Sequence, residues 1–254
     1  YLSTNIIPLE RKNKIEQIKK SKNRKIIVST QLIEAGVDID LDIVFRDFAP
    51  FDSIIQTSGR CNRNNKNETG LVYLFKLKND KDKLYCNYIY ESIQLQPTEK
   101  ILFEKTIITE SELLLLIDKY YNEIKNKLST NNSKELLKDV NNLNYENVFK
   151  NFKLIDYIPN LLVFVESDEK ASEILLKFKD IFKLNDKFKR KEEFLKIKKD
   201  FYGYCISIKV NEKNLSAIQN FEEIGFLKII TFDMINNYYN SQTGFNSDCF
   251  ENFI

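Results

Sequence analysis

The sequence predicts an α/β protein, with a partial, doubly wound parallel sheet in the first third of the chain and a smaller α+β domain after it. Two observations lead to this prediction. Up to about residue 78, short apolar and β-branched runs, typical of strands buried on both faces, alternate with helical patterns. The alternation then stops at a charged linker at 80–83, and a different series of helix and strand patterns follows.

The first third begins with a helix predicted from Pro8, because proline suits the first position of a helix. The basic residues of this helix either contact phosphates or form a solvated face. A strand buried on both faces is predicted at 25–28, and the next strand at 41–45. A helix that begins at Pro50 then leads to a third strand at 71–75.

The middle of the chain is predicted to be helical. Helices are expected at 85–103 and 111–127, the second with Ser111 as its N-cap. A loop rich in Asn and Thr follows at 129–133 and leads into a further helix that ends near residue 156. The second helix carries an apolar stripe that we expect in the core, made of Leu113, Leu114, Leu116, Ile117, Tyr120, Tyr121 and Ile124.

The last third alternates again. The predicted elements are a strand at 161–165, a helix at 168–182, a basic helix at 187–201, and strands at 202–210 and 226–232. Between residues 183 and 199 there are eight Lys or Arg against three Asp or Glu, so this surface either lines a nucleic-acid path or is a solvated face. Tyr202 and Tyr204 either pack in the core or stack on bases. The predicted domains are 1–80, 81–130 (linker helices) and 131–254 (α+β).

Composition excludes several kinds of active site. The sequence of 254 residues contains no histidine, which rules out His-ligated metals, Ser-His triads and histidine general bases within it. Its four cysteines have neither metal-binding spacing nor a C-x-x-C pair, which indicates reduced, packed thiols. The net charge is +2, so any nucleic-acid footprint is local, and no apolar run is long enough to span a membrane. The chain opens at Tyr1, and we expect it to be a fragment or a processed piece.

Two polar clusters follow predicted strands, at the end of a sheet where α/β proteins bind ligands. The first is Ser29-Thr30-Gln31, and the second contains Arg60 and Arg63 beside Gly59. Guanidinium groups remain charged and present a planar fork of donors that suits phosphoryl oxygens. Two arginines three residues apart are also compatible with an ordinary surface, so the spacing alone leaves both interpretations open.

The wider pattern resembles motifs V and VI of superfamily 2 helicases, and more specifically the helicase–nuclease family of type I CRISPR interference. Three runs carry the resemblance: Glu-Ala-Gly-Val-Asp-Ile-Asp at 34–40, Asp-Ser-Ile-Ile-Gln at 52–56 and Gly-Arg-Cys-Asn-Arg at 59–63. The match is dense over residues 24–76 and thin elsewhere. Weaker echoes are Pro-Leu-Glu-Arg at 8–11, which resembles the segment before motif V, and Thr-Gly-Phe at 243–245, which resembles the closing segment of the family.

The resemblance implies a role for each matching residue. Arg60 and Arg63 would be arginine fingers on the γ-phosphate of ATP, and Gln56 would position the nucleotide or its attacking water. Asp38, with the turn at Gly36, would face the nucleotide sugar, and Gly59 would tighten the turn before the arginines. Ser29, Thr30 and Gln31 would contact the backbone of single-stranded DNA. For Asp38 and Ser29 the alternative is ordinary loop capping.

The sequence also departs from the family. It contains neither the phosphate loop G-x-x-x-x-G-K-[ST] nor an acidic magnesium-binding motif of the D-E-x-H type, and it lacks the histidines that the family's metal-dependent nuclease needs. We therefore expect an N-terminally truncated second RecA-like domain and a C-terminal domain. ATP with Mg would be held mainly by an upstream domain, this chain would hold no metal, and alone it would not hydrolyse ATP.

The predicted function is the C-terminal part of an ATP-dependent DNA helicase or translocase of CRISPR interference. The implied partners are single-stranded DNA, an RNA-guided CRISPR effector complex and the upstream helicase–nuclease portion, in the cytoplasm and away from membranes. Two alternatives stay open. The chain is part of another superfamily 2 helicase, or it is a non-catalytic C-terminal module that docks on the effector complex or on DNA.

Overall fold

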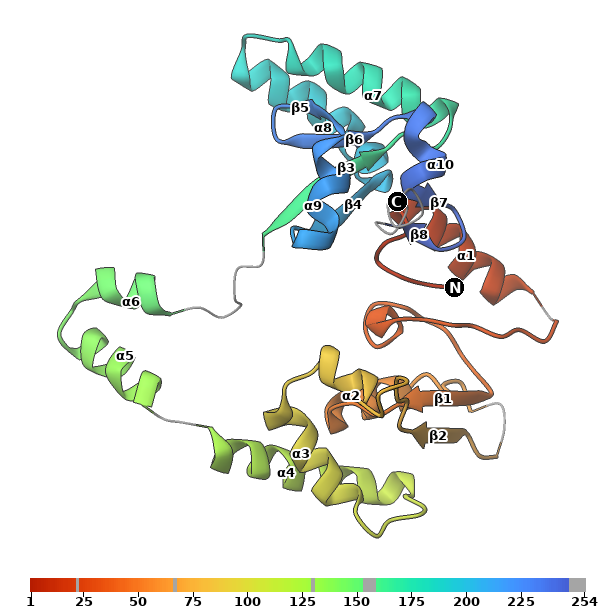
Figure 1. Ribbon diagram of the computed structural model, residues 1–254, viewed down its shortest axis with the longest axis vertical. Coiled ribbons are helices and arrows are strands. Elements are labelled where there is room, and N and C mark those ends of the chain that lie inside the picture. The colour runs from red at the N-terminus through yellow and green to blue at the C-terminus, as the bar shows by residue number, and fades with distance from the viewer. Residues whose placement is uncertain (22, 66–67, 129–130, 153–158, 247–254) are drawn as a thin grey trace. The chain divides into compact units, whose positions relative to one another are not determined.

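The chain folds as two compact units in a computed structural model (Figure 1), which describes residues 1–21, 23–65, 68–128, 131–152 and 159–246. Unit 1 comprises Tyr1–Ile33 and Tyr157–Ile254, and unit 2 comprises Glu34–Asp156. The predicted α/β class is confirmed, since both units combine helices with parallel strand pairs. The predicted domain boundaries at 80 and 130 stay a prediction, because the units reflect contacts within the chain and unit 1 joins two distant segments.

Unit 2 is built on a parallel pair of strands, β1 and β2, whose register sets Val44 beside Val72 and Arg46 beside Leu74. Strand β2 lies where it was predicted, and β1 begins two residues later than predicted. The elements are β1 (Ile43–Asp47), α2 (Phe51–Ser58), β2 (Leu71–Phe75), a 3-10 helix (Tyr85–Tyr88), α3 (Ser92–Leu102), α4 (Glu110–Lys127), α5 (Asn131–Asn141) and α6 (Tyr145–Asn151).

Within the described part of unit 2, apolar side chains gather in two small clusters. One joins Phe51 and Ile54 of α2 to Leu116 and Tyr120 of α4, and the other joins Phe48 to α3 through Leu95. Because α2 carries its apolar residues on one face, packing them on α4 fixes the direction in which the following turn leaves the helix. The predicted core stripe on α4 is confirmed only in part. Leu116 and Tyr120 are buried, whereas Leu114 and Tyr121 are exposed.

Three other predictions in unit 2 are wrong. The single helix at 85–103 is broken, because Glu91 is extended and separates the 3-10 helix from α3. Thr109, and not Ser111, caps α4, since Thr109 and Glu112 bond reciprocally in a capping box. The loop at 129–133 is also wrong within the described residues, because helix α5 starts at Asn131. The end of the helix predicted near residue 156 lies outside the described residues.

Unit 1 contains a four-stranded mixed sheet in the order β4-β3-β6-β5, with the parallel pair β3 and β6 at its centre. Helices α7 and α8 pack against each other beside it. The elements are α1 (Pro8–Lys20), a 3-10 helix (Gln31–Ile33), β3 (Asn160–Val165), α7 (Glu169–Phe182), α8 (Lys187–Gly203), β4 (Cys205–Lys209), α9 (Glu212–Gln219), β5 (Glu222–Ile224), β6 (Leu227–Ile230), a 3-10 helix (Phe232–Met234), α10 (Ile235–Tyr238), β7 (Tyr239–Asn240) and β8 (Gly244–Phe245).

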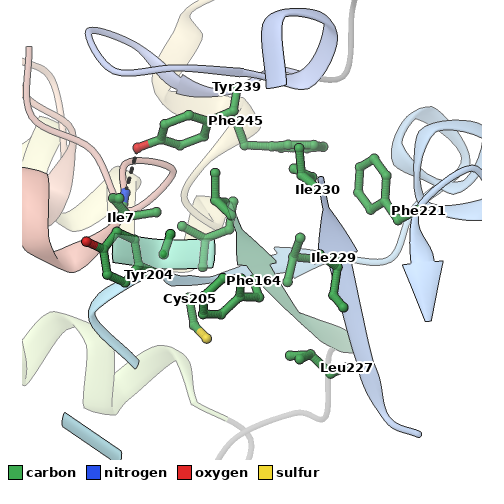
Figure 2. Close-up of a cluster of buried hydrophobic side chains, with 14 of the residues drawn as sticks. Ile7, Phe164, Tyr204, Cys205, Phe221, Leu227, Ile229, Ile230, Tyr239 and Phe245 are labelled. Atoms are coloured by element: carbon green, nitrogen blue, oxygen red, sulfur yellow. Dashed lines mark hydrogen bonds between the residues drawn. The ribbon is translucent and has the colours of Figure 1, made fainter. Parts of the chain in front are cut away.

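A single large apolar cluster fills unit 1 (Figure 2). Phe164 of β3 is fully buried and packs on the rings of Phe201 and Tyr204. The Tyr204 hydroxyl donates to the Asp168 carboxylate, which caps α7, so the core interpretation of Tyr204 is confirmed. Tyr202 is half exposed and lies in the last turn of helix α8, which ends at Gly203, so the predicted strand at 202–210 is wrong at its start and begins only at Cys205. The strand predicted at 226–232 is shorter and is β6.

The two weak sequence echoes meet in unit 1. The Tyr239 hydroxyl accepts a bond from the Ile7 backbone N–H at 3.1 Å and donates to the Glu10 carboxylate at 2.6 Å (Figure 2). Gly244 has φ +88°, and a Cβ built on it would lie 2.4 Å from the backbone of Asn5. Only glycine fits this approach. Residues 5–10 and 239–245, which include parts of both echoes, therefore pack against each other, although more than 200 residues separate them.

The strand predicted at 25–28 is wrong. These residues are extended but form no strand, and Ile26 and Val28 are exposed. Among the described residues, the backbone of the segment pairs with Leu2, whose N–H donates to Val28 O and whose carbonyl accepts from Thr30 N. A β-branched run forms a buried strand only when neighbouring strands cover both of its edges, and among the described residues a single bridge does so on one side.

Candidate functional site

The segment 34–40 alternates between the interior of unit 2 and its surface. Val37 and Ile39 are buried, whereas the Asp38 side chain is 72% exposed between them. Gly36 has φ +75°, a backbone conformation that favours glycine, and the space beside its Cα is open. The apolar residues therefore anchor a turn that presents the Asp38 carboxylate to solvent.

The turn after helix α2 carries the two predicted arginines. Gly59 ends the helix, and the backbone N–H groups of Arg60 and Cys61 bond back to Thr57 and Ser58. Leu41 then fixes the turn on both sides, because its N–H donates to Arg60 O at 2.9 Å and its carbonyl accepts from Asn62 N at 2.7 Å. These two backbone hydrogen bonds hold the arginine turn beside Leu41, the residue that directly follows the 34–40 segment.

Both arginines reach that segment with their side chains. Arg60 Nη2 donates to the backbone carbonyl of Glu34 at 2.7 Å, and Arg63 Nη1 lies 3.4 Å from Asp38 Oδ1. The Arg63 guanidinium is 39% exposed, so this ion pair is long and solvated and contributes little to stability. The structure thus brings Arg60, Arg63, Gly36 and Asp38 together, and their roles toward a nucleotide stay predictions.

Gln56 and Gly59 complete the predicted nucleotide set on the same helix. Gln56 is exposed on α2, one turn before Arg60. A Cβ on Gly59 would make only ordinary contacts, at 3.6 Å, with the helix carbonyls of Ile55 and Gln56, and its φ of −64° is open to any residue. The geometry therefore gives no steric reason for glycine at position 59.

The predicted DNA contacts Ser29, Thr30 and Gln31 belong to unit 1. The Ser29 hydroxyl donates to the backbone carbonyl of Thr30 at 2.9 Å, which is the local capping that we set against a DNA contact. Thr30 and Gln31 are exposed, and Gln31 begins the 3-10 helix. These side chains are accessible to a phosphate backbone, and their role toward DNA stays a prediction.

Some basic side chains of helix α8 contact other groups within unit 1. Arg190 donates to Leu184 O, beyond the end of α7, and its guanidinium lies over the Phe182 ring at 5.6 Å. Lys196 pairs with Glu193 at 2.7 Å. Part of the basic excess is therefore structural, and the interpretation of the rest of α8 as a nucleic-acid surface stays a prediction.

Sequence reasoning missed a buried ion pair under the site. Arg46 of β1 and Glu34 lie 2.8 Å apart, with side chains only 17% and 13% exposed. The same Arg46 nitrogen contacts the hydroxyls of Ser53 and Tyr90 at 2.9 Å each. The signal was present, because Arg46 follows three apolar residues of the strand and occupies an inward position, two residues after the buried Val44.

Gly70 was missed as well. A Cβ there would lie 2.9 Å from Asn62 Cβ and 3.0 Å from Cys61 Sγ, so strand β2 begins directly against the arginine turn. Burial raises the pKa of the Cys61 thiol, which donates to Asp42 O and Leu71 O at 3.4 Å each. Cys61 is therefore a protonated packing residue that joins the turn to β2.

The residues present fit one end of a nucleotide. Two guanidiniums and an open glycine turn suit a phosphate group and its neighbouring backbone contacts. Within the described ranges, no three His, Cys, Asp or Glu side chains converge as metal ligands. No helix in the described part of the chain is long and apolar enough to cross a membrane.

The glycine turn at 34–40 and the arginine turn at 59–63 are the segments whose sequences resemble motifs V and VI of superfamily 2 helicases. Residues 2–66 match the family described as "CRISPR-associated nuclease/helicase Cas3, C-terminal". Cas3 of Haloferax volcanii is 63% identical over 38 residues, which are 15% of this chain and 4% of that protein. Cas3 of Streptococcus thermophilus is 31% identical over 134 residues, which are 48% of this chain and 14% of that protein. The chain thus spans a small part of these relatives.

Solved structures agree at the level of the fold. The crystal structure titled T. fusca Cas3-ATP covers 91% of this chain with a TM-score of 0.54 and 15% identity, and this chain covers 32% of it. The structure titled T. fusca Cas3-ADP also has a TM-score of 0.54, at 14% identity. The predicted resemblance is confirmed, because this chain is similar to the C-terminal part of the Cas3 helicase.

Proposed function

We propose that this chain is the C-terminal part of an ATP-dependent DNA helicase of CRISPR interference and that it supplies the arginines for ATP hydrolysis. One observation carries the proposal. Arg60 and Arg63 leave a turn that two backbone bonds to Leu41 hold in place, and both reach the 34–40 segment, Arg60 at the Glu34 carbonyl and Arg63 at the Asp38 carboxylate. Such a preorganised pair suits a phosphoryl group, because its donors need no rearrangement when charge develops.

The chemical groups of this chain indicate which part of ATP hydrolysis it would perform and which part an upstream portion would perform. Its residues supply cationic donors and no phosphate loop, so the nucleotide with its Mg would be held mainly by an upstream portion. Arg60 and Arg63 would stabilise the charge that spreads over the γ-phosphate oxygens during transfer. Gln56, an exposed residue of helix α2, would orient the nucleotide or its attacking water. Bound ATP would supply the phosphoryl group and the free energy of its hydrolysis.

Coupling to DNA would run through the 34–40 segment. Asp38 pairs weakly with Arg63, so a phosphate that attracts the guanidinium would release the carboxylate toward the nucleotide sugar. Ser29, Thr30 and Gln31, a few residues earlier in the chain, would contact the backbone of single-stranded DNA without reading its sequence. The proposed partners are this DNA, an RNA-guided effector complex and the upstream portion, in the cytoplasm.

A mixing experiment tests the proposal. ATP hydrolysis is measured for the chain alone, for the upstream portion alone, and for their mixture with and without single-stranded DNA. The expected result is hydrolysis that is stimulated by DNA only in the mixture. An upstream portion that hydrolyses ATP equally well without the chain would contradict the proposal.

The rival function is a non-catalytic module that docks on the effector complex or on DNA. The exposed apolar residues of α5 and α6, such as Leu137 and Phe149, favour some docking role. If this rival is correct, the mixture gains affinity for the effector complex while its rate of ATP hydrolysis does not change. Another superfamily 2 helicase would instead hydrolyse ATP with DNA and show no response to an effector complex.

A further inference from the structure

One amino group of Arg46 joins three parts of unit 2 that lie far apart in sequence. Its Nη2 lies 2.8 Å from Glu34 Oε1, 2.9 Å from Ser53 Oγ and 2.9 Å from Tyr90 Oη. Glu34 begins the turn that carries Asp38, Ser53 is in helix α2, and Tyr90 precedes α3. All the groups are largely buried, so these bonds form in a low dielectric and are strong.

We propose that Arg46 is a positioning residue for the ATP hydrolysis assigned above, an inference that rests on the proposed function. It fixes the 34–38 segment against helix α2 and thereby sets the distance between the Asp38 carboxylate and the arginines that follow α2. Arg46 itself touches neither nucleotide nor DNA, and it acts through Glu34 and Ser53.

Glu34 accepts hydrogen bonds from two arginines, so both arginines are positioned relative to this one residue. Arg46 binds its carboxylate, and Arg60 binds its backbone carbonyl at 2.7 Å. The position of the Arg60 guanidinium therefore depends on where Arg46 holds Glu34. A buried ion pair costs desolvation and gives little net stability, so an arginine at this place is better explained by the geometry that it imposes.

The hydrogen-bond inventory shows that the network is not fully satisfied. Nη2 carries two protons but has three acceptors, while Arg46 Nε is buried without a partner among the described residues. Ser53 and Tyr90 lie 3.4 Å apart, so one hydroxyl can donate to the other and leave Nη2 to the remaining two acceptors. Loss of the Tyr90 hydroxyl would therefore remove one member of the network and leave Glu34 and Ser53 as acceptors for Nη2.

The test uses the protein that carries this chain together with its ATP-binding portion. Arg46→Lys keeps the charge, but the lysine nitrogen lies one bond nearer the backbone than Nη2 and so leaves the point on which the three acceptors converge. The expected result is a fall in kcat of DNA-stimulated ATP hydrolysis of about tenfold or more, with KM for ATP changed less than about threefold. Tyr90→Phe, which keeps the ring, is expected to lower kcat about twofold to fivefold, and this loss reports on the network even if Arg46→Lys folds poorly.

A double substitution separates positioning from a merely structural role. If Arg46 acts through the segment that carries Asp38, then Arg46→Lys has little further effect on kcat in an Asp38→Asn background. Losses of kcat that multiply would overturn the proposal. Lys105→Met is the matched control, because Lys105–Glu112 is an ion pair of the same length, 2.8 Å, in unit 2 that touches no residue of the network. It is expected to leave kcat unchanged.

Failure of this inference is distinguishable from failure of the proposed function. If the wild type hydrolyses ATP with DNA and Arg63→Ala abolishes hydrolysis, the proposed function stands. An Arg46→Lys variant with the kcat of the wild type would then overturn only the positioning role. A wild type that Arg63→Ala does not affect would overturn the proposed function and the inference together.

Discussion

Unit 1 and unit 2 keep their structures by different means. Unit 1 surrounds a mixed sheet with one continuous apolar core, whereas unit 2 has two small apolar clusters and a buried polar network beneath the arginine turn. Apolar packing is tolerant of direction, but hydrogen bonds fix the orientation of the groups that they join. We therefore expect substitutions in the core of unit 1 to change stability. We expect conservative substitutions around the unit 2 network to change first the geometry of the candidate site and the rate of ATP hydrolysis.

The largest expected effect on stability is in the core of unit 1. Phe164→Ala removes a fully buried ring between Phe201 and Tyr204, and we expect it to lower the free energy of unfolding by about 4 kcal/mol. Phe188→Ala in the same unit is the matched control, because that side chain is 87% exposed, and it should change stability by less than about 0.5 kcal/mol. Denaturant titration measures both, and equal losses would mean that the core is misplaced.

Two glycines with positive φ, one in each unit, allow the two units to be compared directly. Gly244→Ala in unit 1 should cost about 3 kcal/mol, since a methyl group would meet the backbone of Asn5 and add strain at φ +88°. Gly36→Ala in unit 2, at φ +75° with open space around it, should cost about 1 kcal/mol or less. Hydrogen exchange localises each loss to its unit. A larger loss for Gly36→Ala would contradict the proposed packing of residue 244 on the start of the chain.

The hydrogen bonds between Tyr239 and residues 7–10 are expected to make a smaller contribution to stability. Tyr239→Phe removes the hydroxyl that binds Ile7 N and Glu10, and it should cost about 1.5 kcal/mol because both partners lose a buried bond. Tyr202→Phe, on a half-exposed ring, is the control and should be close to neutral. Thermal unfolding of the two variants gives the difference. A neutral Tyr239→Phe would show that this bond does not hold helix α1.

The smallest expected effect is a pH dependence at the start of helix α4. Bonds from Lys105, and from Thr109 in the capping box, lower the pKa of Glu112 from 4.5 to about 2. Since the folded pKa is depressed, the stabilisation is present above pH 4.5 and is lost as the pH falls toward 2. NMR titration of the Glu112 carboxyl should show this value, and Lys105→Met should raise it. An unchanged pKa in Lys105→Met would mean that the ion pair does not form in solution.

The sequence predicted those elements whose signals are local. Helix α1 begins at Pro8, β2 spans the predicted residues 71–75, and Asp168 caps α7, because proline, a bounded β-branched run and a capping carboxylate each act within a few residues. The segment 25–28 has the same kind of run as β2 but does not form a strand. Its outcome depends on partner strands, which no local pattern encodes.

Only some residues of the candidate site could be predicted from the sequence. The resemblance marked Arg60, Arg63 and Asp38, and in the structure Arg63 pairs with Asp38 while Arg60 bonds to the Glu34 carbonyl of the same segment. It assigned no role to Arg46, whose partners at 34, 53 and 90 become neighbours only after folding. A charged residue at an inward strand position is the signal that was available, and it indicates a buried partner without naming one.

The most direct test of the central claim is the rate of ATP hydrolysis after loss of Arg63 from the protein that carries this chain and its ATP-binding portion. Arg63→Ala is compared with Arg24→Ala, an exposed arginine of unit 1, in the presence of single-stranded DNA. The account predicts that kcat falls about 1,000-fold in Arg63→Ala and is unchanged in Arg24→Ala. An Arg63→Ala protein that hydrolyses ATP at the rate of the wild type would contradict it.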